Sequence, residues 1–152
     1  MPNISSHQVI VDYGIALDQM IGGRLEIDPD AQLDGFFIKG QDRVSAVLSL
    51  AHFHLEQVTM HDIKHCFKMN DIKPAGLEHL IALGVQCRDL MGNFSIVALG
   101  ADWRGLGVVG RVPRLTQLKK KRVLGSMYDQ VYWSKDYFIL GVHKQEPITD
   151  KA

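Results

Sequence analysis

The stretch from Thr59 to Leu99 constrains the fold more strongly than any other part of the chain. Its first half carries a helix start, because Thr59 and Asp62 are spaced so that each side chain can accept a hydrogen bond from the other's backbone N–H. Apolar residues then recur at steps of three and four, beginning at Ile63. The sequence therefore predicts a helix over 60–69.

The second half of this stretch predicts another helix, followed by a β-hairpin. Pro74 suits the first turn of a helix, where its missing N–H costs nothing, and Gly84 can end a helix in the left-handed conformation. Strand-forming residues then occupy 85–90 and 94–99, and the Met-Gly-Asn between them supplies turn chemistry. We therefore expect a helix over 74–83 and antiparallel pairing of the two strands.

A further helix is expected just before this stretch, at 43–57, with Asp42 as its N-cap. Its apolar face would consist of Val44, Val47, Leu48, Ala51, Leu55 and Val58. Three helices followed by a hairpin is the element order of a winged helix. The stretch 59–99, about a quarter of the chain, resembles bacterial winged-helix regulators in this order and in the positions of Ile63, Ile72, Leu77, Leu80 and Leu83. The resemblance implies a DNA-binding regulator.

The N-terminal part of the chain is expected to add one helix and one small hairpin. Ser5 and Gln8 have capping-box spacing, and the apolar residues that follow at helical steps predict an amphipathic helix to Ile21. Gly-Gly then stops the helix. Two short apolar segments, 24–28 and 36–39, should form the strands of the hairpin.

The last third of the chain is rich in strand-forming residues. Segments 123–133 and 137–143 should pair as a hairpin in a twisted antiparallel sheet. Since 152 residues with 46% hydrophobic content can build one core, and no long linker interrupts them, we expect a single α+β domain. It would consist of a winged-helix-like region 43–99, a strand-rich region 100–145 and a frayed tail 146–152.

Several features of the composition indicate a cytoplasmic protein. No apolar run approaches the roughly 18–20 residues that cross a bilayer. The first residues lack the basic and apolar regions of a signal peptide. Two cysteines, Cys66 and Cys87, are too few for a disulfide framework, so both are expected to be reduced. No role at a membrane is predicted.

Charge is distributed unevenly along the chain, although the formal net charge is zero. The first 102 residues carry −6 and the last 50 carry +6. Such an asymmetry could mark a face that contacts nucleic acid or an acidic partner. The candidate contacts are the basic residues of the last third: Arg111, Arg114, Lys119, Lys120, Lys121 and Arg122.

The helix expected at 74–83 argues against DNA binding as the leading function. Recognition helices present Arg, Lys, Ser, Asn or Gln to bases and phosphates. This helix offers only Glu78 and His79 after Lys73, and the turn at 91–93 carries no basic residue. Nucleic acid is therefore a possible partner that the sequence does not favour.

Two short motifs have the spacing of cofactor or metal sites but lack their surroundings. Residues 105–110 form G-x-G-x-x-G, yet the valines around them favour a strand, and Pro113 blocks the helix that would face a pyrophosphate. His61 and His65 lie four apart on one helix, without an obvious third ligand. No cofactor, no metal ion and, for want of a nucleophile with its base, no catalytic centre is predicted.

Aromatic side chains of the last third could line a ligand pocket or a subunit interface: Trp103, Tyr128, Tyr132, Trp133 and Tyr137. The strands that carry them would be apolar on both faces, which favours association with a second copy. The leading hypothesis is a non-enzymatic binding or adaptor protein that self-associates as a homodimer. The alternatives are a winged-helix DNA-binding regulator, and a small-molecule-binding protein or enzyme with an aromatic pocket in the C-terminal sheet.

Overall fold

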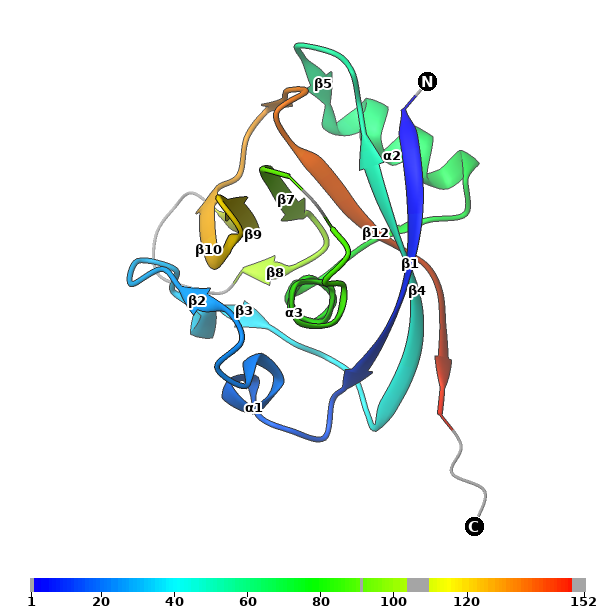
Figure 1. Ribbon diagram of the computed structural model, residues 1–152. Coiled ribbons are helices and arrows are strands. Elements are labelled where there is room, and N and C mark those ends of the chain that lie inside the picture. Colours follow the sequence, from blue (N-terminus) through cyan, green and yellow to red (C-terminus); the bar gives the residue numbers. More distant parts are fainter. Residues whose placement is uncertain (1, 91, 104–109, 149–152) are drawn as a thin grey trace.

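The structure, a computed structural model, describes residues 2–90, 92–103 and 110–148. These residues form mostly β-structure, with three α-helices and one short 3₁₀-helix (Figure 1). No described helix is long and apolar enough to cross a membrane. The helices are α1 (Leu17–Ile21), η1 (Leu33–Gly35, the 3₁₀-helix), α2 (Met60–Met69) and α3 (Leu77–Gln86).

Most strands belong to one mixed sheet with the order β1-β4-β12-β7-β9-β10-β2, in which β6 also pairs with β12. Neighbours are antiparallel except β12 with β7 and β10 with β2, which are parallel. Its strands are β1 (Asn3–Asp12), β2 (Glu26–Ile27), β4 (Arg43–His52), β6 (Lys73–Pro74), β7 (Phe94–Ala98), β9 (Arg111–Leu118), β10 (Lys121–Tyr128) and β12 (Phe138–Pro147). Two smaller pairs join β3 (Phe36–Phe37) with β8 (Asp102–Trp103) and β5 (Val58–Thr59) with β11 (Tyr132–Trp133).

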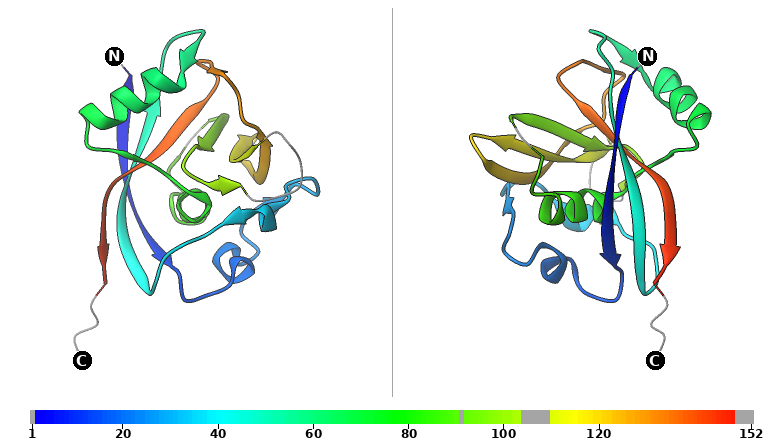
Figure 2. Two further views of the ribbon diagram at one scale, coloured as in Figure 1. Left: turned by 180° about the vertical axis from the view of Figure 1, so that it is seen from behind. Right: turned by 45° about the vertical axis from the view of Figure 1, so that its right-hand side comes forward.

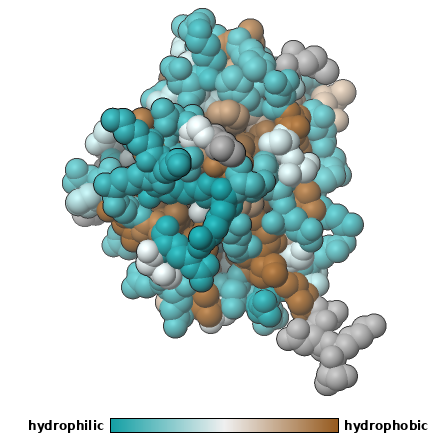
Figure 3. Space-filling view, viewed as in Figure 1, coloured by the Kyte–Doolittle hydropathy of each residue, from teal (hydrophilic) through white to brown (hydrophobic). Residues whose placement is uncertain are grey.

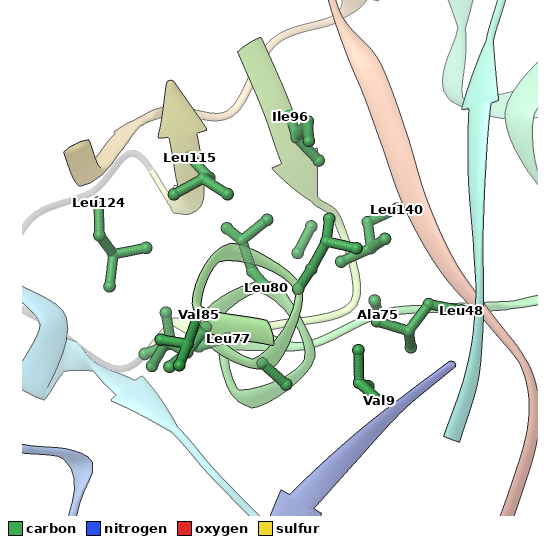
Figure 4. Close-up of a cluster of buried hydrophobic side chains, with 14 of the residues drawn as sticks. Val9, Leu48, Ala75, Leu77, Leu80, Val85, Ile96, Leu115, Leu124 and Leu140 are labelled. Carbon is green, nitrogen blue, oxygen red and sulfur yellow. The ribbon is translucent and has the colours of Figure 1, made fainter. Parts of the chain in front are cut away.

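Helix α3 lies inside the curve of the large sheet, with strands on several sides of it (Figure 1). Every residue from 77 to 85 is buried. A helix that is apolar almost all round has to be enclosed, and this segment is apolar except for Glu78 and His79. Side chains from strands far apart in the sequence meet α3 in one cluster (Figure 4): Val9, Leu48, Ile96, Leu115, Leu124 and Leu140.

The large sheet carries a second core on its opposite face. Because side chains alternate across a strand, Leu50 and its partner Leu140 face α3, whereas the adjacent pair Ala51 and Ile139 faces away. Helix α2 covers this second face, as both views in Figure 2 show. The second core consists of Ala51, Phe53, Val58, Ile63, Phe67, Ile72, Val97, Val112, Trp133 and Ile139.

The segment between β1 and β4 covers the side of α3 that the sheet leaves open. It contains α1, β2, η1 and β3, and their buried side chains belong to the same cluster as α3. These side chains are Ile21, Leu25, Leu33 and Phe36. The short elements of this segment therefore act mainly as a lid of apolar side chains over the central helix.

The winged-helix-like region predicted at 43–99 is wrong, and with it the expected fold class. Residues 43–52 form β4, a strand paired on both sides with β1 and β12, instead of a helix. The hairpin of 85–90 with 94–99 does not form, because α3 continues to Gln86 and β7 pairs with β12 and β9. The described residues therefore form a sheet-dominated fold around one helix, and the likeness to winged-helix regulators does not extend to the structure.

The predicted N-terminal helix is also wrong, as are the predicted N-terminal hairpin and the predicted C-terminal hairpin. Residues 3–12 form β1, and only the short α1 is helical before Gly22. Strand β2 pairs with β10 and β3 with β8, so these two short strands do not form a hairpin with each other. Strand β12 lies between β4 and β7, and β10 pairs with β9. In addition, β12 reaches Pro147, where the sequence predicts a frayed tail from 146.

The two helices of the central stretch are present. Helix α2 spans Met60–Met69 as predicted, and its capping box is confirmed: Asp62 N–H donates to Thr59 Oγ1 at 3.1 Å and Thr59 N–H donates to Asp62 Oδ2 at 3.2 Å. The helix predicted at 74–83 begins and ends three residues later, at Leu77 and Gln86. Gly84 does not end it, but lies buried within it, where a Cβ would come within 3.0 Å of Leu115.

Candidate functional site: a groove along helix α3

An open cavity of about 340 Å³ lies between α3, the C-terminal end of β1 and α1. Its volume is within the usual range of small-molecule sites, about 300–1,000 Å³. Figure 3 shows hydrophobic surface near the C-terminal end of β1, bordered by hydrophilic side chains. We call this cavity the α3 groove; its apolar lining is Ile10, Val11, Ile15, Met20, Ile81, Ala82 and Val85, and its polar lining is Asp12, Gln19, Arg24, Arg43, Glu78 and Gln86.

The apolar wall of the α3 groove follows from the helical repeat. Side chains three or four positions apart share one face of a helix, so Glu78, Ala82 and Val85 lie along a single stripe of α3. Ile15, in the loop between β1 and α1, is 37% exposed and forms part of the opposite rim. A molecule in the groove would therefore contact apolar side chains from two separate segments.

The polar end of the α3 groove is formed by the carboxylate of Glu78, a residue that is only 6% exposed. The phenol of Tyr13 donates a hydrogen bond to it. Two glycines make room for this pair, because a Cβ at Gly76 would collide with the Glu78 carboxylate and one at Gly40 would lie 2.5 Å from the Tyr13 ring. Glu78 also lies in the first turn of α3, where the helix dipole favours a negative charge.

His79 and Gln145 extend this hydrogen-bonded network. Gly76 N–H donates to His79 Nδ1 at 3.0 Å, so Nδ1 carries no proton and Nε2–H donates to Gln145 Oε1 at 2.8 Å. Glu78 Oε1 lies 3.5 Å from the same Nδ1, but an ion pair there would require a proton that displaces the Gly76 bond. The hydrogen-bond geometry therefore favours a neutral His79 that holds Gln145 beside Tyr13.

Burial raises the pKa of Tyr13 far above its usual value, and the charge of Glu78 and the hydrogen bond to it act in the same direction. A hydrogen bond from the Gln145 amide opposes the shift. The phenol therefore stays protonated and keeps donating to Glu78 over the physiological pH range. This bond orients the carboxylate, whose remaining acceptor positions can serve a ligand in the groove.

Gln86, on the rim of the α3 groove, fastens α3 to the outer edge of β1. Its Oε1 accepts the N–H of Ile10 at 2.8 Å, and its Nε2 donates to the carbonyl of Ile10 at 2.6 Å. Because β1 is the last strand of the sheet, this side chain takes the place of a neighbouring strand at that point. The two walls of the groove are thus fixed relative to each other.

A second cavity, of about 480 Å³, adjoins the α3 groove at the C-terminal end of α3. It shares Arg24 and Val85 with the groove. We call it the basic pocket, because its charged lining residues are all cationic: Arg24, Arg88, Lys120 and Arg122. The rest of its lining consists of Gly84, Val85, Leu90, Gly92 and Gln117.

Arg122 is held in the wall of the basic pocket by four hydrogen bonds. Nη1 donates to the carbonyls of Gly84 and Cys87 at 2.8 and 2.9 Å, and Nη2 donates to that of Leu90 at 3.2 Å. Nε donates to Gln117 Oε1 at 2.6 Å. Burial lowers the pKa of Arg122, but the guanidinium remains charged. It supplies hydrogen bonds to the free carbonyls at the end of α3 and interacts favourably with the negative end of the helix dipole.

Four of the aromatic residues predicted to form a pocket or interface, Tyr128, Tyr132, Trp133 and Tyr137, are not brought together as one site. Trp133 and Tyr137 pack edge to face, 5.0 Å between ring centroids, in and against the second core, where Trp133 Nε1 has no hydrogen-bond partner among the described atoms. Tyr132 is 50% exposed, and Tyr128 lies under the Arg111 guanidinium at 4.8 Å. Trp103 lies in β8. Tyr128, Tyr132, Trp133 and Tyr137 do not line the α3 groove or the basic pocket.

The six basic residues predicted to contact a partner have separate environments. Arg111 bonds to Ser126, and Lys121 forms an ion pair with Glu26 at 3.1 Å. Arg114 Nη1 lies 3.9 Å from the sulfur of Met127. Lys120 and Arg122 line the basic pocket together, and Lys119 stands beside Lys120 in the turn between β9 and β10. Binding to nucleic acid stays a prediction.

The two cofactor-like motifs can be placed only in part. Most of the glycine motif, residues 105–109, lies outside the described residues, and Gly110 is exposed. His61 and His65 are exposed on α2. Within the described residues, no group of three or more His, Cys, Asp or Glu side chains is placed to hold a metal ion.

Sequence reasoning missed the polar end of the α3 groove. It gives Glu78, Tyr13 and Gln145 no part in a ligand site. The available signal was two polar residues, directly after a glycine, at the start of a helix that is otherwise apolar. The contact of that helix with residue 145 depends on the order of strands in the sheet, and no local sequence pattern predicts that order.

The chain was also compared with known proteins. No protein-family model, no curated protein sequence and no solved structure matches it.

Proposed function

We propose that the protein is a non-enzymatic binding protein that takes a small amphipathic molecule into the α3 groove. The observation that supports this most is an open cavity whose floor is formed by buried apolar side chains of α3, Ala82 and Val85 among them, and which ends at the buried carboxylate of Glu78. Ligand sites are typically apolar clefts with a few fixed polar groups. The groove combines both features in the part of the fold where the helix and the sheet edge are held together.

The groove favours a ligand with an apolar body and a group that donates a hydrogen bond to Glu78. From Glu78 to Val85 the helix advances by about 10 Å, at about 1.5 Å per residue. An extended chain of about eight carbons suits that length. Linear alcohols have both features, because an alkyl chain can lie on Ala82 and Val85 while the hydroxyl donates to the carboxylate.

Titration with butan-1-ol, hexan-1-ol and octan-1-ol, followed by the backbone amide NMR spectrum, tests the proposal. We expect affinity to rise by about fourfold per added methylene, because each buried CH₂ contributes about 0.8 kcal/mol. The shifted resonances should belong to the lining residues, Ile15, Met20 and Ala82 among them.

A matched pair of variants localises the binding. Ile15→Glu places a charge on the rim of the groove and should weaken octan-1-ol binding by about five- to tenfold. Leu55→Glu is the control, since Leu55 is also an exposed aliphatic residue in a loop but does not line the groove. Affinity that is independent of chain length, or equally weakened by both variants, would contradict the proposal.

We further infer a cytoplasmic location. Both cysteines are free, and burial is the largest cause that raises the pKa of the Cys66 and Cys87 thiols. Free thiols are typical of a reducing compartment. Cell fractionation tests this inference, and recovery of the protein from an oxidising compartment would refute it.

A further inference from the structure

We propose that the basic pocket is the subsite for a phosphate monoester group on the ligand whose apolar part occupies the α3 groove. This inference rests on the proposed function, and it adds the chemical class of the ligand. It is carried by three cationic side chains, Arg24, Arg88 and Lys120, that line one cavity and have no anionic partner among the described residues.

The charges at the basic pocket do not cancel within the protein. Arg122 is already matched by the carbonyls at the end of α3 and by Gln117. Arg24, Arg88 and Lys120 form no ion pair with any described residue. Asp89 is the carboxylate that acts on Arg122 from nearby, and it does not line the pocket. The three positive charges of Arg24, Arg88 and Lys120 therefore remain for a ligand.

That surplus favours a dianion. A carboxylate can be matched by a single arginine fork, whereas a phosphate monoester carries about −1.5 to −2 charges near pH 7 and has three terminal oxygens that accept hydrogen bonds. Arg24 and Arg88 can offer planar forks and Lys120 a third donor group. The three cations match both the charge and the acceptor number of a terminal phosphate.

The two cavities are neighbours, which allows one ligand to place its phosphate in the basic pocket and its apolar chain in the α3 groove. Arg24 and Val85 line both of them. A chain that starts from a phosphate in the basic pocket would pass Val85 and Ala82 and reach towards Glu78. The ligand class is therefore an alkyl or similarly apolar phosphate monoester.

Three probes of equal chain length separate the two subsites: octan-1-ol, octyl sulfate and octyl phosphate, each below its aggregation concentration and at low ionic strength. At pH 7.5 we expect octyl phosphate to bind about tenfold more tightly than octan-1-ol, since two or three partly exposed ion pairs contribute about two- to fivefold each. Affinity for octyl phosphate should rise between pH 5 and 7, as its second proton leaves with a pKa near 6. Octyl sulfate, a monoanion throughout, should not show this rise.

Charge-removing variants test the residues. Arg88→Gln and Lys120→Gln should each weaken octyl phosphate binding by about two- to fivefold and leave octan-1-ol binding unchanged. Lys119→Gln is the matched control, because it removes the same charge from the adjacent position of the same turn but does not line the pocket. Arg122 is left intact because it holds the end of α3.

Each outcome decides between the proposals. Equal affinity for octyl phosphate and octan-1-ol would overturn the phosphate subsite, while octanol binding that is sensitive to Ile15→Glu would keep the proposed function. Equal losses in Lys119→Gln and Lys120→Gln would also overturn the subsite, since the attraction would then be to the general surface charge. If neither octan-1-ol nor octyl phosphate binds, both proposals fall.

Discussion

At the scale of single residues, the polar end of the α3 groove depends on two glycines, because a side chain at either position would occupy space that the site needs. Gly76 leaves space for the Glu78 carboxylate, and Gly40 leaves space for the Tyr13 ring. A buried carboxylate without a partner costs about 1–3 kcal/mol or more, so the Tyr13 phenol is a structural requirement as well as a feature of the site. Because of this arrangement, the free energy of unfolding should fall at alkaline pH.

Replacement of Tyr13 by Phe should weaken that dependence. The folded protein raises the pKa of Tyr13, whereas the unfolded chain ionises near pH 10. Above pH 10 the unfolded state therefore binds fewer protons than the folded state, and the free energy of unfolding falls by up to about 1.4 kcal/mol per pH unit. Below pH 10 the contribution of Tyr13 is fully present.

Urea unfolding between pH 8 and pH 11 measures this slope. Tyr13→Phe should be less stable by about 1–2 kcal/mol at pH 8, because the Glu78 carboxylate loses its donor, and should fall less steeply above pH 10. Tyr128→Phe, at a 60% exposed position, is the control and should keep the slope of the natural sequence. Identical slopes for the two variants would show that Tyr13 is not the group responsible.

At the scale of elements, local sequence signals predicted the helices, whose formation depends on residues a few positions apart. The capping box of α2 lies within four residues, and the expected helix is confirmed to the residue. The sequence predicts both ends of α3 three residues too early, because Pro74 resembles a helix start and Gly84 a helix stop. In the structure Gly84 permits close packing against Leu115 within the helix.

The error at 43–57 shows why the large sheet could not be predicted. The apolar residues of this segment fit a helical face, but Val44, Ala46, Leu48 and Leu50 also alternate as a strand, and this second pattern is the one buried. What decides between them is pairing with β1, about 40 residues earlier, and with β12, about 90 residues later. The α3 groove depends on the same long-range pairing, so the sequence alone did not reveal it.

The turn between β9 and β10 offers a test at this scale. Its two central residues, Lys119 and Lys120, have φ of 52° and 67°, in the left-handed region that Asn and Gly tolerate better than Lys. Lys119→Asn and Lys120→Gly should each raise the free energy of unfolding by about 0.5–1 kcal/mol. Lys39→Asn, at an exposed loop residue without positive φ, should give no gain.

These variants also link the turn to the basic pocket. Thermal and urea unfolding give the stabilities, and octyl phosphate titration gives the binding. Lys119→Asn should gain stability without losing phosphate affinity, whereas Lys120→Gly should gain stability and lose affinity by about two- to fivefold. A loss of stability in both variants would mean that the lysine side chains support the turn in some other way.

At the scale of the whole molecule, the prediction of a homo-oligomer remains, but the structure changes where its interface should lie. Strand β12 has neighbours on both sides, so the C-terminal strands offer no long free edge there. One edge of the sheet is β1, which runs for ten residues and carries no Lys, Arg, Asp or Glu before Asp12. Uncharged, long edge strands readily pair with another chain.

The free edge of β1 can be assigned residue by residue. Both the N–H and the C=O of Ile10 bond to Gln86, so both point away from β4. In an antiparallel ladder the same orientation recurs at every second residue, which places the backbone groups of Gln8, Ser6 and Ile4 on the free edge. Two copies of β1 could therefore pair antiparallel and continue the large sheet across a two-fold axis.

Light scattering at micromolar concentration tests this dimer, with an expected mass of twice 17.1 kDa. Ser6→Pro removes an N–H from the free edge but none from the ladder with β4, so it should give the monomer mass while the protein stays folded. Ser6→Ala keeps the N–H and should remain a dimer. A mass of 17.1 kDa for the natural sequence would refute self-association, and a dimer that survives Ser6→Pro would place its interface away from β1.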